Sequence, residues 1–163
     1  MANASLTRWP AGAEPEGAPV YTYNAIDVAA PPERVWAWLV RATRWPSYYD
    51  NASNIRFPTG GGPDLALGTR FTWRTFSVSV DTTVTELVPN ERLAWRGKTV
   101  GGTGHHGWVI ERTAGGCRVV TEETQRGVVP SLGRLFLRRG LLTQHQRWLE
   151  GLKRVAESGP PAP

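Results

Sequence analysis

Apolar and polar side chains alternate along most of the middle of the chain, and this pattern predicts a protein built largely of β-strands. The first strand is expected over residues 20–29, where both faces carry bulky side chains and should be covered. Further strands are expected over residues 69–76, 77–88, 92–98, 105–112 and 118–127. Asn90 and Gly115-Gly116 are turn signals of the hairpin type, so successive strands should form an antiparallel meander.

A helix is expected directly after the first strand. Pro31 and Pro32 suit a helix start, because proline loses no hydrogen bond there, and apolar side chains follow at helical spacing. The segment Arg44-Trp45-Pro46 breaks this helix. A short second helix is expected just beyond it and should carry Tyr48 and Tyr49.

The end of the chain predicts one long amphipathic helix over residues 131–157. Apolar side chains recur there every seven residues, which indicates a stripe that faces a sheet. The stripe consists of Leu135, Leu142, Leu149 and Ala156, with Leu132, His145 and Leu152 between them. Gly140 costs about 1 kcal/mol relative to alanine inside a helix and marks either a kink or a close approach of a ligand or strand.

The length suits one domain with a substantial core, which we place at residues 20–157. Residues 1–19 are rich in alanine and proline and should form a flexible tail, as should residues 158–163. The first segment lacks the features of a signal peptide, and no apolar run approaches the ~18 residues of a membrane span. We therefore expect no membrane insertion. Cys117 is the only cysteine, so we expect no intrachain disulfide and a cytoplasmic location.

The formal net charge is +5, carried by seventeen arginines and two lysines against fourteen acidic residues. Such a balance is compatible with nucleic acid, a membrane surface or anionic ligands. The arginines are spread along the chain, which favours a bias in the base composition of the source over a nucleic-acid footprint. We therefore expect no nucleic-acid partner.

The order of elements, with the motifs that occupy it, resembles the START-like (SRPBCC) superfamily, in particular its bacterial polyketide cyclase/dehydrase group. The motifs are IDVAAPPERVWAWL, RWPSYY, VTELVPNERLAWRG and GWVIERTAGGCRVVTEETQRG, and the resemblance covers residues 20–157. It implies an α+β helix-grip fold: a curved antiparallel sheet of six to seven strands wrapped on a long C-terminal helix, with two short helices after the first strand. The family's ligands are apolar and lie between sheet and helix.

Alternation along the strands assigns side chains to this cavity. His106, Trp108 and Ile110 share the bulkier face of their strand and should point inward, whereas His105 should face solvent. Glu123 lies on the corresponding face of the next strand. The other side chains expected to contact the ligand are Tyr48, Tyr49, Phe71, Trp73, Trp95, Thr121, Gln125, Leu142 and His145.

His106 is the best candidate for proton transfer, since an imidazole titrates near neutral pH and a nearby carboxylate such as Glu123 can orient it. The alternatives are a structural hydrogen bond or a plain cavity wall. Glu123 itself must be paired or protonated if buried, and the other candidate partners are the arginines Arg74 and Arg96.

No nucleophile elbow, phosphate loop, dinucleotide fingerprint or zinc pattern occurs, so we expect neither a metal nor a cofactor. Two hypotheses remain. The protein is either a carrier or sensor of a lipid-like or aromatic ligand, or a cofactor-independent cyclase, aromatase or dehydratase that uses His106 as its acid/base. Either would act as a monomer or homodimer on a hydrophobic, aromatic or polycyclic small molecule.

Overall fold

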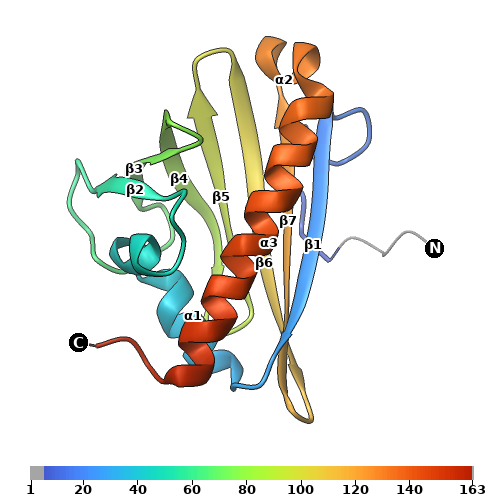
Figure 1. Cartoon of the computed structure of the whole chain (residues 1–163). Coiled ribbons are helices and arrows are strands. Elements are labelled where there is room, and N and C mark those ends of the chain that lie inside the picture. The colour runs from blue at the N-terminus through green and yellow to red at the C-terminus, as the bar shows by residue number, and fades with distance from the viewer. Residues whose placement is uncertain (1–5, 163) are drawn as a thin grey trace.

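A computed structural model describes residues 6–162, and within that range the chain forms one seven-stranded antiparallel sheet. The strands are β1 (Val20–Val28), β2 (Ser53–Arg56), β3 (Arg70–Thr75), β4 (Val78–Val88), β5 (Arg92–Thr99), β6 (Gly102–Thr113) and β7 (Gly116–Arg126). The helices are α1 (Pro32–Val40), the 3-10 helix η1 (Ala42–Ser47), α2 (Val128–Leu132) and α3 (Arg134–Ser158). The strand order is β1-β7-β6-β5-β4-β3-β2, and α3 runs diagonally across one face of the sheet (Figure 1).

This is the expected helix-grip fold, and most strands lie where the alternation predicted them. The short edge strand β2 was not anticipated. The strand expected over residues 105–112 starts earlier, because Gly102, Thr103 and Gly104 belong to β6. Tyr48 and Tyr49 follow η1 and are not part of it, because η1 ends at Ser47.

The C-terminal helical region is also divided. Gly133 separates α2 from α3. The sequence predicted that the buried apolar stripe continues into the first turns of the long helix, and it does not. Leu132 and Leu135 are exposed, and Leu142 is half-buried beside the buried Leu141. None of the helices among the described residues is both long and apolar enough to cross a membrane.

An aromatic cluster fills the space between the sheet and the C-terminal half of α3. The indole of Trp148 stacks on the ring of Tyr49 with centroids 4.4 Å apart, and it meets Trp45 and Trp108 edge-to-face at 5.0 Å each. Large rings in such arrangements dominate core energetics. The cluster sits at the α1 end of the molecule and does not fill the α2 end of the same space.

Gly151 lets α3 approach this core. A Cβ atom there would lie 2.0 Å from the carbonyl oxygen of Tyr48, so only glycine fits. At Gly140 the corresponding atom would meet Phe76 at an ordinary 3.5 Å. The close approach that the sequence suggested at Gly140 is therefore made eleven residues further along, by Gly151.

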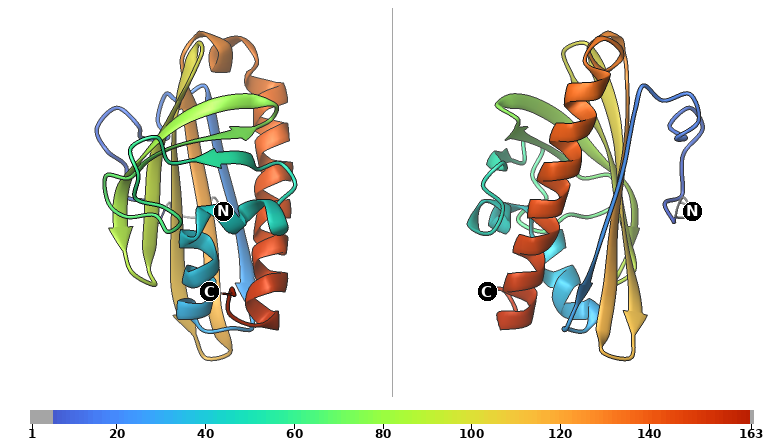
Figure 2. Two further views of the ribbon diagram at one scale, coloured as in Figure 1. Left: turned by 90° about the vertical axis from the view of Figure 1, so that its left-hand side faces the viewer. Right: turned by 45° about the vertical axis from the view of Figure 1, so that its right-hand side comes forward.

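Residues 6–19 lie against the convex face of the sheet, opposite α3 (Figure 2). The backbone amides of Leu6 and Thr7 and the Thr7 hydroxyl all donate to Glu122 Oε2, at 3.0, 2.9 and 2.7 Å. Arg126 donates to the carbonyl of Glu14 at 2.7 Å. The segment expected to be a flexible tail thus makes these hydrogen bonds to the sheet. Residues 1–5 lie outside the described range.

The same segment covers His105, whose side chain was expected to be exposed to solvent. His105 points to the convex face as predicted, but the ring of Trp9 lies 5.5 Å above it and leaves it only 4% exposed. The expectation of a solvent-facing side chain was therefore wrong, because a distant part of the chain covers this face. At the other terminus, Trp38 donates to the carbonyl of Gly159 at 2.8 Å.

Candidate functional site

A cavity of about 550 Å³ lies between the concave face of the sheet and α3, on the α2 side of the aromatic core. Seven of the residues expected to contact a ligand line it. They are Tyr49, Trp73, Trp95, His106, Glu123, Gln125 and His145. Its walls are otherwise mostly apolar, and sequence reasoning missed Trp148, Leu137 and Leu141 among them. Trp148 was recognisable, because it lies three residues after His145 and so on the same helical face.

The other residues expected to contact the ligand do not line the cavity. Tyr48 packs edge-to-face on Trp38 at 5.8 Å, and Phe71 and Trp108 are core residues. Thr121 is buried behind His106, to which it is hydrogen-bonded. Leu142 is half-buried, and its neighbour Leu141 lines the cavity in its place.

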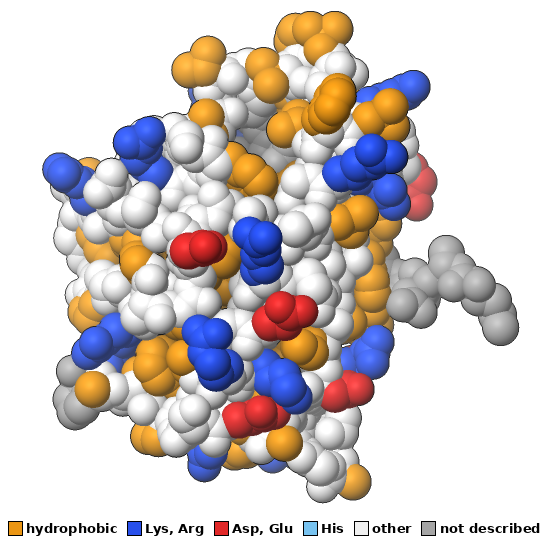
Figure 3. Space-filling model, viewed as in Figure 1, with side chains coloured by type: hydrophobic (Ala, Val, Ile, Leu, Met, Phe, Trp, Pro, Cys, Tyr) orange, Lys and Arg blue, Asp and Glu red, His pale blue; other side chains and the backbone are white. Residues whose placement is uncertain are grey.

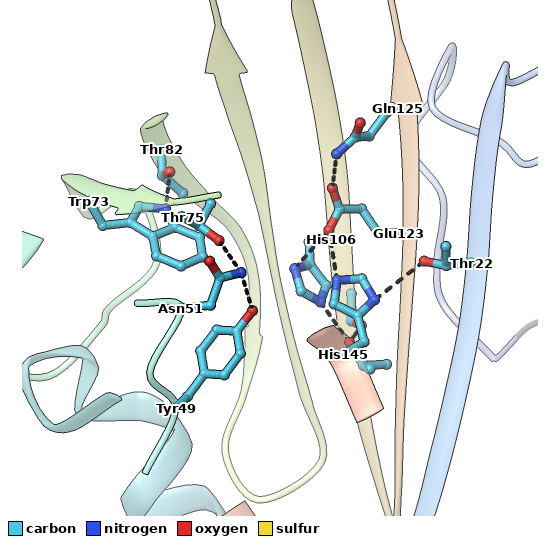
Figure 4. Close-up of polar contacts among 12 residues, drawn as sticks. Thr22, Tyr49, Asn51, Trp73, Thr75, Thr82, His106, Glu123, Gln125 and His145 are labelled. Atoms are coloured by element: carbon cyan, nitrogen blue, oxygen red, sulfur yellow. Dashed lines mark hydrogen bonds and ion pairs between the residues drawn. The ribbon is translucent and has the colours of Figure 1, made fainter. Parts of the chain in front are cut away.

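Three polar side chains converge at one wall of the cavity (Figure 4). The carboxylate oxygen Oε2 of Glu123 lies 3.3 Å from His106 Nδ1 and 3.1 Å from His145 Nε2. His106 and Glu123 are directly opposed residues of β6 and β7, so their side chains share one face of the sheet. His145 reaches the same oxygen from α3, with its ring beside that of His106. We call these three residues the polar triad.

Two buried threonines orient the imidazole rings. Thr121 Oγ1 lies 2.6 Å from His106 Nε2, and Thr22 Oγ1 lies 3.3 Å from His145 Nδ1. Because an ionised carboxylate can only accept, we assign the proton of each ring to the nitrogen that faces Glu123. The second nitrogen of His145 then accepts from Thr22, whereas the single hydroxyl proton of Thr121 is shared between His106 Nε2 at 2.6 Å and the carbonyl oxygen of Gly107 at 3.2 Å. Gln125 donates to the other carboxylate oxygen at 2.7 Å.

Burial controls the protonation of His106. Removal from water lowers the pKa of His106 more than the nearby Glu123 carboxylate raises it, to about 3. Burial alone would raise the pKa of Glu123, but His106 and the hydrogen bond from His145 outweigh it and lower the pKa to about 2. At neutral pH the triad therefore holds a neutral His106 and an ionised carboxylate that both rings stabilise. The arginines suggested as partners of Glu123 are exposed and lie elsewhere.

A second polar group lies across the cavity from the triad (Figure 4). Asn51 Nδ2 donates to the Tyr49 hydroxyl at 2.9 Å and to Thr75 Oγ1 at 3.1 Å. Burial raises the pKa of Tyr49 to about 12, so its phenol stays protonated. An apolar ligand in this cavity would thus meet aromatic walls and two separate polar anchors.

The triad also has the composition of a metal-binding site. One ligand atom from each of His106, Glu123 and His145 lies within 4.8 Å of the other two, and two imidazoles with a carboxylate suit zinc or iron. The sequence predicted no metal, because these residues come from two strands and a helix and form no spacing motif. The same contacts are satisfied as hydrogen bonds, so the geometry by itself does not require an ion.

Fold and cavity together define a helix-grip protein with an internal ligand site. The sequence matches the family described as polyketide cyclase / dehydrase and lipid transport over residues 21–157. The chain therefore belongs to this family, whose members include cyclases and lipid carriers, and binding of a hydrophobic ligand follows from that membership.

Solved structures agree with this assignment. The hypothetical protein jhp0584 from Helicobacter pylori is 28% identical, with a TM-score of 0.87 over 96% of this chain and 99% of its own. The Zhui aromatase/cyclase from Streptomyces sp. R1128 is 14% identical, with a TM-score of 0.71 over 84% of this chain and 93% of its own. The second likeness shows the fold alone. The sequence finds no match among curated proteins.

Proposed function

We propose that this protein binds an aromatic or polycyclic small molecule, or its polyketide-like precursor, in the cavity and promotes cyclisation or dehydration with the polar triad. The observation that carries the proposal is the buried triad itself. A purely apolar ligand would need only apolar walls, and placing a carboxylate in such a wall is costly. The pairing of Glu123 with two imidazoles supports a chemical use of this wall.

The chemistry is within reach of these residues. In an aldol cyclisation a base takes a proton from a carbon between two carbonyls, the enolate attacks another carbonyl of the same chain, and the new alkoxide is protonated. Dehydration then takes a proton from the neighbouring carbon, forms a carbon–carbon double bond and releases the hydroxyl with a proton as water. To act as the base, His106 would exchange its hydrogen bond from Thr121 for the proton of the carbon, with Glu123 stabilising the imidazolium, and would return that proton to oxygen, so no net proton is consumed. Tyr49 would hold a carbonyl at the opposite wall.

The shape of the cavity would supply the rest of the catalysis. The cavity would hold a flexible chain folded with the reacting carbons in contact. The entropic cost of bringing these carbons together would then not add to the barrier of the reaction. The rings of Trp73, Trp95 and Trp148 offer flat surfaces on which a planar product can stack. A volume of about 550 Å³ is within the range of pockets that hold drug-sized molecules.

The test uses a synthetic poly-β-ketone thioester and follows formation of the aromatic product by its absorbance. His106→Ala should keep the fold and the affinity but lower the rate by at least ~10²-fold. His105→Ala is the matched control, because this neighbouring imidazole lies on the convex face. An unchanged rate in His106→Ala would rule out the acid/base role.

The family also contains lipid carriers, and the apolar walls make a non-catalytic carrier or sensor the second candidate. A denaturing solvent extract of the purified protein, measured by mass spectrometry against a blank, separates the two. A stoichiometric lipid or aromatic molecule that the protein returns unchanged, with no turnover of the thioester, would establish the carrier.

A further inference from the structure

Large apolar side chains are exposed at one end of the molecule. Val100 is 97% exposed, Phe136 86% and Leu132 85%, and Val128 and Leu135 are 68% exposed each. They lie on the β5–β6 turn, on α2 and on the first turn of α3. Together with Phe76, Val78 and Val129 we call them the apolar rim. Among the described residues, Leu67 is the one exposed large apolar side chain that lies outside the apolar rim.

The apolar rim surrounds the entrance of the cavity. Phe76, Val78, Val100 and Val129 line the cavity and are nevertheless 40% to 97% exposed, so the cavity must open among them. Figure 3 shows hydrophobic side chains gathered at this end around a hollow in the surface. The exposed apolar surface and the route of the ligand therefore coincide.

The rim belongs to defined structure. The amide of Val129 donates to the carbonyl of Gly101 at 3.1 Å, which ties α2 to the β5–β6 turn. Ser131 Oγ donates to the carbonyl of Gly127 at 2.7 Å. A soluble monomer rarely holds so much apolar surface in water unless the surface binds something.

The charge beside the rim indicates what it binds. Between Glu123 and Glu150 the chain carries five arginines and no acidic residue. Three of them, Arg134, Arg138 and Arg139, lie on the first turns of α3 directly beside the rim. Apolar side chains flanked by arginines on a helix are typical of segments that lie in the surface of an anionic bilayer.

The geometry points to docking of the apolar rim on an anionic lipid bilayer, with the cavity entrance against the hydrocarbon, so that a hydrophobic ligand passes between membrane and cavity without crossing water. This inference requires that the cavity takes an apolar ligand, but it does not depend on whether the polar triad is catalytic. The arginines would contact lipid phosphates, while Leu132 and Phe136 would enter the acyl region.

The test is co-sedimentation of the full chain with phosphatidylcholine vesicles that contain or lack phosphatidylglycerol. We expect binding to the anionic vesicles that weakens as salt is raised. The double variant Leu132→Ser/Phe136→Ser should lose at least about tenfold in affinity. Leu67→Ser is the matched control, because Leu67 is 67% exposed but lies away from the rim, and it should bind as the wild type does.

A second pair of variants tests the charge. Arg134→Gln/Arg138→Gln should weaken binding to anionic vesicles and leave the small affinity for neutral vesicles unchanged. Circular dichroism checks that each variant folds. Turnover of a water-soluble thioester should be unaffected in all of them, which keeps this inference separate from the proposed function.

Three results would overturn the inference: no binding of the wild type to anionic vesicles, equal binding of the Leu132→Ser/Phe136→Ser variant, or an equal loss in Leu67→Ser. Light scattering addresses the rival occupant. A dimer that the rim variant abolishes, without vesicle binding by the wild type, would show that the rim pairs with a second copy of this chain.

Discussion

Acidification should destabilise the folded protein through His106. Burial lowers the pKa of His106 from 6.5 to about 3, so between these values the unfolded chain binds a proton that the folded protein does not. Stability therefore rises with pH across this window and is lost as the pH falls. The groups around the ring do not reverse the sign: Glu123 stays ionised above pH 4.5, and its own lowered pKa adds a loss only below that value.

The magnitude follows from proton linkage. One proton taken up only by the unfolded chain changes the free energy of unfolding by about 1.4 kcal/mol per pH unit. From about pH 6.5 to about pH 5 this amounts to about 2 kcal/mol from His106. His105, whose pKa burial also lowers, contributes in the same direction.

Urea unfolding followed by tryptophan fluorescence at about pH 7 and about pH 5 measures this loss. His106→Gln should have a smaller difference between the two pH values than the wild type, by about 2 kcal/mol. His105→Gln shows how much of the remaining difference that residue carries. Equal pH dependence in the wild type and in His106→Gln would refute the reasoning, since the buried neutral imidazole would then have no energetic effect.

The remaining predictions concern the packing of α3 on the sheet. Gly151→Ala would bring a methyl group 2.0 Å from the carbonyl oxygen of Tyr48, so thermal unfolding should show a loss of roughly 1–3 kcal/mol; an unchanged midpoint would contradict the close approach. Gly140→Ala meets only Phe76 at 3.5 Å and should stabilise the helix by up to about 1 kcal/mol, and a lower midpoint would show that the space is not there. Trp148→Ala should cost roughly 3–5 kcal/mol and abolish ligand binding, whereas retained affinity would place the ligand elsewhere.

Much of the sheet was predictable because strand patterning is local. The alternation along β6 correctly placed His106, Trp108 and Ile110 on the inner face, and the hairpin turn after β6 brought Glu123 opposite His106. A period of two residues and a short turn are enough to determine both the face and the partner. The same reasoning put His105 on the outer face but could not show that it is covered.

The α3 stripe shows where local patterning fails. The heptad pattern extended the buried face to Leu132 and Leu135, whereas both are exposed in the structure. Hydrophobicity alone does not distinguish a side chain that faces a core from one at the entrance of a cavity. The pattern also misplaced the inward face of the helix by one residue, since Leu141 and not Leu142 lines the cavity.

The sequence by itself indicated most of the strands and the inward side chains of β6, since these depend on neighbours only a few residues apart, and the resemblance to a known family supplied the fold class. Only the tertiary structure brought His145 within 3.1 Å of Glu123. Its position depends on how α3 lies across the sheet, where Gly151 allows the helix to pack closely against Tyr48. The covering of the convex face by residues 6–19 depends in the same way on Glu122, more than a hundred residues away. Such long-range contacts leave no periodic pattern in the sequence, and they determine which side chains meet in the polar triad.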